Sequence, residues 1–535
     1  MVLSTAQQLD STYKVWKRFT YPDDEKGRID AIAVPKEVGD TLNAAYALII
    51  DLALVHFWSI LFSVILYFYI RRQKGKELDP LAPKLWNKRS DLFDLVFGAL
   101  TSLSLKCPSP PTVLILLLCL AGWVGQKATG ILVPPLILVN NAAPVDPNAI
   151  YVPDISDTST LALANLFALE APRFLRALGG TAAGEQIREK VEINQSPLLG
   201  QTDDGENIYR YDYQYSATGA DMGLQRFPDL TLKVVGSCVT EYGWYNDTRS
   251  LVDQNNGVTF VDLYNVWGNK TDVPFDVSLY DGRQPSATFF SGTNSSQGTL
   301  PNSNATWAAV VSSRDRYSFS SSNDPWYRTG PIEDSQYVVL GARPALLCWQ
   351  DDVWSYQGQN STVEALNTLP GLDLSDGLQF IMSSILGTPM IELVGLHLQA
   401  SALLSSTTAN NQLFDAGASS IRTDLERLVQ AAYVATINSL TDLTLYPAGV
   451  SSKLLNIARD GSAKPLDGID DFVVWTPDVA ALSTVAIIVI PSVFVGLWLI
   501  AIILLYWSPV RAVNKLESDG TLAKIDAPKK SSGNP

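Results

Sequence analysis

The chain has 535 residues, with 39 Lys and Arg against 54 Asp and Glu, so its formal net charge is −15. An acidic chain of this kind is not expected to bind nucleic acid, because a phosphate backbone requires a basic surface. Two histidines and four cysteines are too few for the usual His- and Cys-rich zinc sites, and no cofactor or metal is predicted.

Residues 1–43 are polar, and we expect them to form an extracytoplasmic N-terminal segment. Three apolar stretches follow that reach the length of about 20 residues needed for a membrane-spanning helix. These predicted transmembrane helices cover residues 44–70, 112–139 and 480–506. The lipid bilayer is therefore the first expected partner.

Loop charges predict the orientation, because cytoplasmic loops carry an excess of Lys and Arg. The loop 71–111 holds eight basic and four acidic residues, and the tail 507–535 holds five and three. Residues 140–477 hold 19 basic and 38 acidic residues, which predicts an extracytoplasmic domain. The C-terminal tail is then cytoplasmic, and its composition suggests disorder. Within the basic loop, residues 91–105 suggest an amphipathic helix at the membrane surface. The alternative is a fourth span, which would change the assignment of the first two loops.

The large segment 140–477 changes character along its length. From about 205 to 360 it is rich in strand-like runs, including "IYRYDYQY", in which alternate tyrosines share one face. Helical periodicity returns from about 376 to 440. The expected fold is therefore three transmembrane α-helices plus a large α+β extracytoplasmic domain with a β-rich, sandwich-like core flanked by helices.

Cys238 and Cys348 are the two cysteines of this outer segment. In an oxidising compartment they are the natural disulfide pair, whereas two buried free thiols are the alternative. The same segment carries five N-x-[ST] sequons, which predict N-glycosylation only if the segment enters the secretory lumen. Their asparagines are Asn246, Asn269, Asn294, Asn304 and Asn360.

Charged side chains inside the predicted spans are costly and therefore informative. Asp51 lies in the first span and Lys127 in the second, at depths that allow an ion pair. The interpretations are a gate or relay, a neutralising pair that joins two helices, or a Lys127 that marks the end of a shorter span, and we favour the last two over the first. His56 also lies in the first span and is interpreted as a packing residue.

No catalytic motif stands out, so no catalytic residue is assigned. His397 is the one histidine of the outer segment, and its apolar context indicates a core position. Two functions remain. We expect a non-enzymatic glycoprotein of the plasma membrane that binds, senses or adheres through an extracellular ligand, glycan or protein partner. The alternative is an outward-facing carbohydrate-active hydrolase that uses paired carboxylates.

Overall fold

The computed structural model describes most of the chain and divides it into two compact units. The large unit consists of Met1–Lys14, Phe19–Ile29 and Ala142–Thr476, and the helical unit of Val15–Arg18, Asp30–Asn141 and Pro477–Pro535. The described residues are 12–23, 25–72, 110–133, 136–154, 159–181, 184–196, 198–252, 258–275, 286–292, 305–332, 336–341, 343–410, 413–446 and 456–506.

Several sequence predictions fall outside these residues. They are the amphipathic helix 91–105, most of the basic loop 71–111, the tail 507–535, and the sequon asparagines Asn294 and Asn304.

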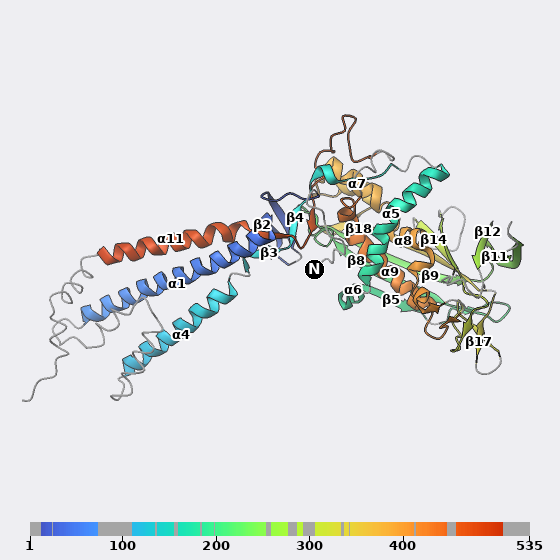
Figure 1. Cartoon of the computed structure of the whole chain (residues 1–535), viewed down its shortest axis with the longest axis horizontal. Coiled ribbons are helices and arrows are strands. Elements are labelled where there is room, and N and C mark those ends of the chain that lie inside the picture. The colour runs from blue at the N-terminus through green and yellow to red at the C-terminus, as the bar shows by residue number, and fades with distance from the viewer. Residues whose placement is uncertain are drawn as a thin grey trace, which may run out of the picture. The chain divides into compact units, whose positions relative to one another are not determined.

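Three long helices make up most of the helical unit: α1 (Lys36–Arg72), α4 (Pro110–Leu132) and α11 (Thr484–Tyr506). Both α4 and α11 pack against α1 (Figure 1). The approach of α1 to the chain just before α11 is close, because a Cβ on Gly39 would lie 2.4 Å from the Ala480 side chain. Further along, the Tyr46 hydroxyl donates to the Ile487 carbonyl at 3.0 Å.

Short strands lie next to these helices and correct the predicted span limits. β2 (Gly27–Pro35) pairs with β23 (Val479–Ser483), which also pairs with β3 (Leu138–Asn140). The stretches 138–139 and 480–483 are therefore strand, whereas α1 starts eight residues before residue 44. Hydropathy could not make this distinction, because a short apolar run looks the same at the end of a helix and in a buried strand.

α1 and α11 are long and apolar enough to cross a membrane. Their most apolar windows are 11% and 0% buried, so nearly all of this apolar surface is open to a surrounding phase. Besides these two helices, a bent pair formed by α7 (Asp376–Leu386) and residues 390–408, which begin with α8 (Met390–Leu398), is also long and apolar enough, with its two halves at 55° to each other. Most residues of α8 are buried inside the large unit, which argues for a core role instead.

The large unit is built on an antiparallel seven-stranded sheet. The order is β13-β14-β18-β9-β8-β5, and β19 pairs with the end of β18. The sheet starts at Val191, earlier than the predicted core boundary near 205. The strands are β5 (Val191–Gln195), β8 (Arg210–Thr218), β9 (Thr231–Glu241), β13 (Ser286–Gly292), β14 (Ala305–Ser312), β18 (Ala345–Tyr356) and β19 (Gln359–Ser361).

Helices cover one face of this sheet. α9 (Ile421–Ile437) packs on β5 and β8, α8 packs on β13, and α5 (Thr160–Thr181) packs on both α8 and α9 (Figure 1). The alternating tyrosines of β8 belong to this interface. Tyr211, Tyr213 and Tyr215 are buried, and the Tyr215 hydroxyl lies 3.2 Å from the Thr436 hydroxyl of α9. These rings are core and not an exposed stacking platform.

A second sheet contacts the β13–β14 region through the three strands β10 (Tyr245–Val252), β11 (Val258–Val266) and β12 (Asn269–Phe275). An apolar cluster joins it to β14 and β18, with Trp244, Tyr264 and Val273 against Val310 and Leu347. The large unit is therefore a mixed α+β fold with antiparallel sheets. The expected sandwich is limited to this region, because helices occupy the other face.

The remaining elements are short and complete the two units. They are β1 (Arg18–Asp23), β4 (Ala142–Pro144), η2 (Pro147–Ala149), α6 (Glu185–Lys190), β6 (Gly200–Gln201), β7 (Asn207–Ile208), β15 (Tyr317–Ser318), β16 (Thr329–Pro331), β17 (Tyr337–Val339), η4 (Val363–Thr368), η5 (Gln399–Ala402), η6 (Leu404–Thr408), β20 (Ala409–Asn410), β21 (Leu413–Phe414), α10 (Ser439–Asp442) and β22 (Val473–Trp475).

Candidate functional site

A pocket opens beside β18, along the edge where its pairing partner changes from β14 to β19. β18 pairs with β14 as far as Gln350 and with β19 from Trp354 onward. Between them, residues 351–353 pair with β9 on the other side. The cavity has a volume of about 450 Å³. Its lining residues are Gln350, Asp351, Asp352, Val353, Trp354, Asn360, Ser361, Thr362, Val363, Glu364, Leu386, Gly387 and Pro389.

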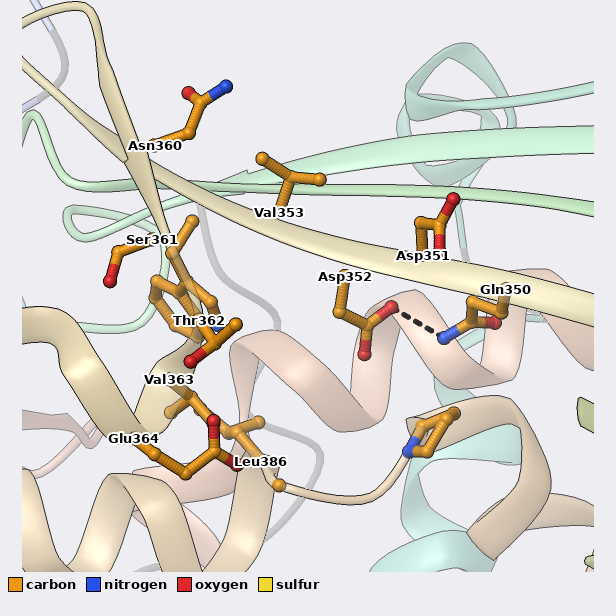
Figure 2. Close-up of a pocket in the computed structure, with 13 residues that line it drawn as sticks. Gln350, Asp351, Asp352, Val353, Asn360, Ser361, Thr362, Val363, Glu364 and Leu386 are labelled. Carbon is orange, nitrogen blue, oxygen red and sulfur yellow. Dashed lines mark hydrogen bonds between the residues drawn. The ribbon is translucent and has the colours of Figure 1, made fainter. Parts of the chain in front are cut away.

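Two carboxylates lie on the same side of β18 in this pocket. Figure 2 shows Asp352 below the strand, on the side where Glu364 of η4 lies, and Asp351 above it. This follows from the strand geometry, because successive side chains point to opposite faces. Asp351 and Asp352 are adjacent in the sequence, but they lie on opposite faces of β18. The two carboxylates that share one side of the strand are Asp352 and Glu364.

Asp352 has a perturbed acidity. Burial raises the pKa of its carboxyl to about 6, and the hydrogen bond from Gln350 partly opposes this effect. That bond runs from Gln350 Nε2 to Asp352 Oδ1 at 2.7 Å. The neighbouring Asp351 charge acts in the same direction as burial. A pocket carboxyl that titrates near neutral pH is a candidate proton donor or ligand-binding group.

The rest of the chamber combines polar groups with an apolar wall. Thr362 occupies the N-cap position of η4, but its side chain makes no capping hydrogen bond. Val363 and Leu386 are buried and form part of the wall, together with Pro389. Trp354 also lines the pocket but is only 1% exposed, so it offers little ring surface to a ligand.

The sequon at Asn360 lies on the rim of this pocket. Its side chain is exposed, and Figure 2 shows it pointing away from Asp352 and Glu364. A glycan on Asn360 would therefore leave the Asp352 chamber open. Asn246 on β10 and Asn269 on β12 are also exposed. All three positions are thus accessible to a glycan on the folded chain.

The structure contains the disulfide between Cys238 and Cys348, whose positions are 110 residues apart in the sequence. The two cysteines face each other in the register of β9 and β18, and both are fully buried. This confirms the pairing and rejects the alternative of two free thiols. The bond ties together the two central strands of the large sheet, and β18 continues from it into the pocket.

In the helical unit, Asp51 of α1 and Lys127 of α4 come together. Lys127 Nζ lies 3.9 Å from Asp51 Oδ1. Gln126, which the sequence interpretation missed, donates from Nε2 to the same oxygen at 2.9 Å. An uncharged amide gives little signal within an apolar stretch, so sequence alone did not reveal it. His56 lies beside Phe494 of α11, with ring centroids 5.9 Å apart.

His397 has a packing role between α8 and α5. Its side chain is 5% exposed, and Nε2 lies 3.2 Å from Glu170 Oε2. The rings of Phe167 and Phe174 lie 4.4 and 4.6 Å from the imidazole. The other ring nitrogen, Nδ1, lies 2.8 Å from the Leu393 carbonyl oxygen. Among the described residues, no group of three or more His, Cys, Asp or Glu side chains is arranged to hold a metal ion.

Residues 171–474 match a protein family described as "Domain of unknown function (DUF8406)". The chain belongs to this family. The matched region starts within α5 and ends within β22, so it contains the large sheet, the pocket and the disulfide but none of α1, α4 and α11. No curated protein and no solved structure matches the chain.

Proposed function

We propose that this protein is an integral membrane glycoprotein of the plasma membrane whose outer domain, residues 140–477, binds a ligand, glycan or protein partner without chemically altering it. One observation carries the membrane anchor: the apolar windows of α1 and α11 are 11% and 0% buried. Water cannot solvate such surfaces favourably over that length, whereas lipid can. α4, which pairs with α1, serves as the second of three spans in this proposal.

Charge and chemistry support the orientation. The basic loop 71–111 and the tail 507–535 lie in the cytoplasm, with the N-terminus and the acidic domain outside. The Cys238–Cys348 disulfide fits an oxidising compartment, where such bonds persist. The exposed asparagines of the described sequons fit the same side of the membrane. α11 spans about 35 Å at about 1.5 Å per residue, enough for a plasma membrane.

Glycosylation tests this orientation. We expect the protein from eukaryotic cells to lose mass on treatment with an N-glycosidase. Separate Asn→Gln changes at Asn246, Asn269 and Asn360 should each remove one glycan from the gel shift. A protein that shows no shift at any sequon, while it fractionates with membranes, would place residues 140–477 on the cytoplasmic side and contradict the proposal.

A second function has one specific observation in its favour. Asp352 and Glu364 share a chamber, and burial raises the pKa of Asp352 to about 6. Glycoside hydrolysis uses a pair of carboxyl groups, one of which has a raised pKa and acts as the general acid. An outward-facing carbohydrate-active hydrolase is therefore the alternative. The hydrolase requires turnover of a carbohydrate substrate that Asp352→Asn abolishes. The binding function requires no turnover.

A further inference from the structure

The lining of the pocket beside β18 indicates the chemical class of its ligand. This step rests on the proposed function, in which the outer domain binds a ligand, and it names the site and the ligand class. A volume of about 450 Å³ lies within the range of roughly 300–1,000 Å³ that small-ligand pockets occupy.

Charge excludes one class of ligand. The lining contains three acidic residues, Asp351, Asp352 and Glu364, and no Lys, Arg or His. Like charges repel strongly where the surroundings are partly desolvated. Phosphorylated, sulfated and carboxylated ligands are therefore disfavoured at this position.

The hydrogen-bonding groups of the chamber favour a ligand with hydroxyl groups. None of the described residues donates a hydrogen bond to the Glu364 carboxylate. The Asp352 carboxylate receives a hydrogen bond from Gln350 and keeps further acceptor capacity. The Thr362 hydroxyl does not cap η4 and can donate or accept. Neighbouring hydroxyls of a sugar ring can satisfy such groups together.

The apolar wall adds a second requirement. Val363, Leu386 and Pro389 line the same chamber as the polar groups. A small ammonium ion would leave this wall without a partner, whereas a sugar ring presents both hydroxyl groups and C–H surface. Pockets that mix an apolar lining with a few placed polar groups orient such ligands. We infer that this pocket binds the terminal unit of a neutral saccharide through Asp352, Glu364 and Thr362.

The test uses the full-length protein in lipid nanodiscs and saturation-transfer NMR. The saccharide probes are chitobiose in its N-acetylated form, cellobiose, mannobiose and lactose. Spermidine and glucuronic acid are the cationic and anionic probes. We expect saturable binding of at least one saccharide, weakened at least tenfold by Glu364→Ala and by Asp352→Asn. The matched control Asp229→Asn, at an exposed turn, should leave binding within twofold of the unchanged protein.

Each outcome is decisive. Binding of spermidine or glucuronic acid in place of the saccharides overturns the inference, as does a lack of binding by all four saccharides. Saccharide binding that survives both pocket variants also overturns it. If the sequons carry glycans but no saccharide binds, the inference fails while the proposed orientation stands. Hydrolysis of the bound disaccharide supports the pocket assignment and replaces the binding function with the hydrolase.

Discussion

Removal of the Cys238–Cys348 disulfide is expected to lower the free energy of unfolding of the large unit by about 4 kcal/mol. The bond links positions 110 residues apart. In the chain-entropy account, closing so long a loop restricts the unfolded chain strongly and thereby stabilises the folded one. The double variant Cys238→Ala with Cys348→Ala removes this restriction, and denaturant titration followed by tryptophan fluorescence measures the loss.

Cys119 of α4 provides the matched control, because it lies in the helical unit. Cys119→Ala should not alter the unfolding transition of the large unit. A reducing agent should shift the unfolding transition of the original protein towards that of the double variant. A loss below about 1 kcal/mol for the double variant would show that the strand pairing of β9 and β18 supplies the stability without the covalent bond.

The second large effect concerns pH and Asp424, a fully buried residue of α9. Its carboxylate accepts hydrogen bonds from the Tyr327 hydroxyl and, at 2.8 Å, from the Ser405 amide. Burial nevertheless raises the pKa of Asp424 to about 7, with the bonds from Tyr327 and Ser405 acting in the opposite direction. The folded chain therefore keeps a proton on this group that the unfolded chain releases.

The direction of the pH dependence follows from the difference between the folded and the unfolded pKa of Asp424. An unfolded Asp titrates at about 3.9, so the contribution of Asp424 is fully present below pH 4 and is lost as the pH rises towards 7. The loss is at most about 1.4 kcal/mol per pH unit between these values. Asp424→Asn removes the titration, so its free energy of unfolding should fall less steeply over the same range.

Burial also raises the pKa of Asp324 and Asp471 to about 6, so these groups contribute to the pH dependence as well. The contribution of Asp424 is therefore taken as the difference in slope between Asp424→Asn and the unchanged protein. Denaturant titrations at pH 4.5, 5.5 and 6.5 measure the free energy of unfolding of each. Asp203→Asn, at an exposed turn, should keep the slope of the unchanged protein. If the free energy of unfolding changed with pH at the same slope in Asp424→Asn and in the unchanged protein, Asp424 would be ionised in the folded state over this whole pH range.

The sequence predicted the features that depend on composition and local period. Length and apolarity located α1, α4 and α11, and the alternation of tyrosines located β8. The disulfide could be predicted because residues 140–477 hold two cysteines. The ends of the helices could not be predicted from the sequence, because β3 and β23 are also apolar. Only their pairing shows that these segments are strands.

The candidate pocket could not be predicted from the sequence for a physical reason. Asp352 and Glu364 are 12 positions apart on a strand and a 3-10 helix, and the turn between β18 and β19 brings them to one chamber. The raised pKa of Asp352 depends on burial, which no local pattern encodes. The count of acidic residues gave no means of choosing this pair from the many others.

Protease protection shows directly whether residues 140–477 lie outside the cell. Cells that express the protein with an epitope tag at the C-terminus are treated with protease while intact. We expect cleavage within residues 140–477, with the tag retained on a protected fragment that contains α11, and loss of the tag only after detergent is added. Protection of residues 140–477 in intact cells, with access to them only after lysis, would contradict an outer domain held by three spans.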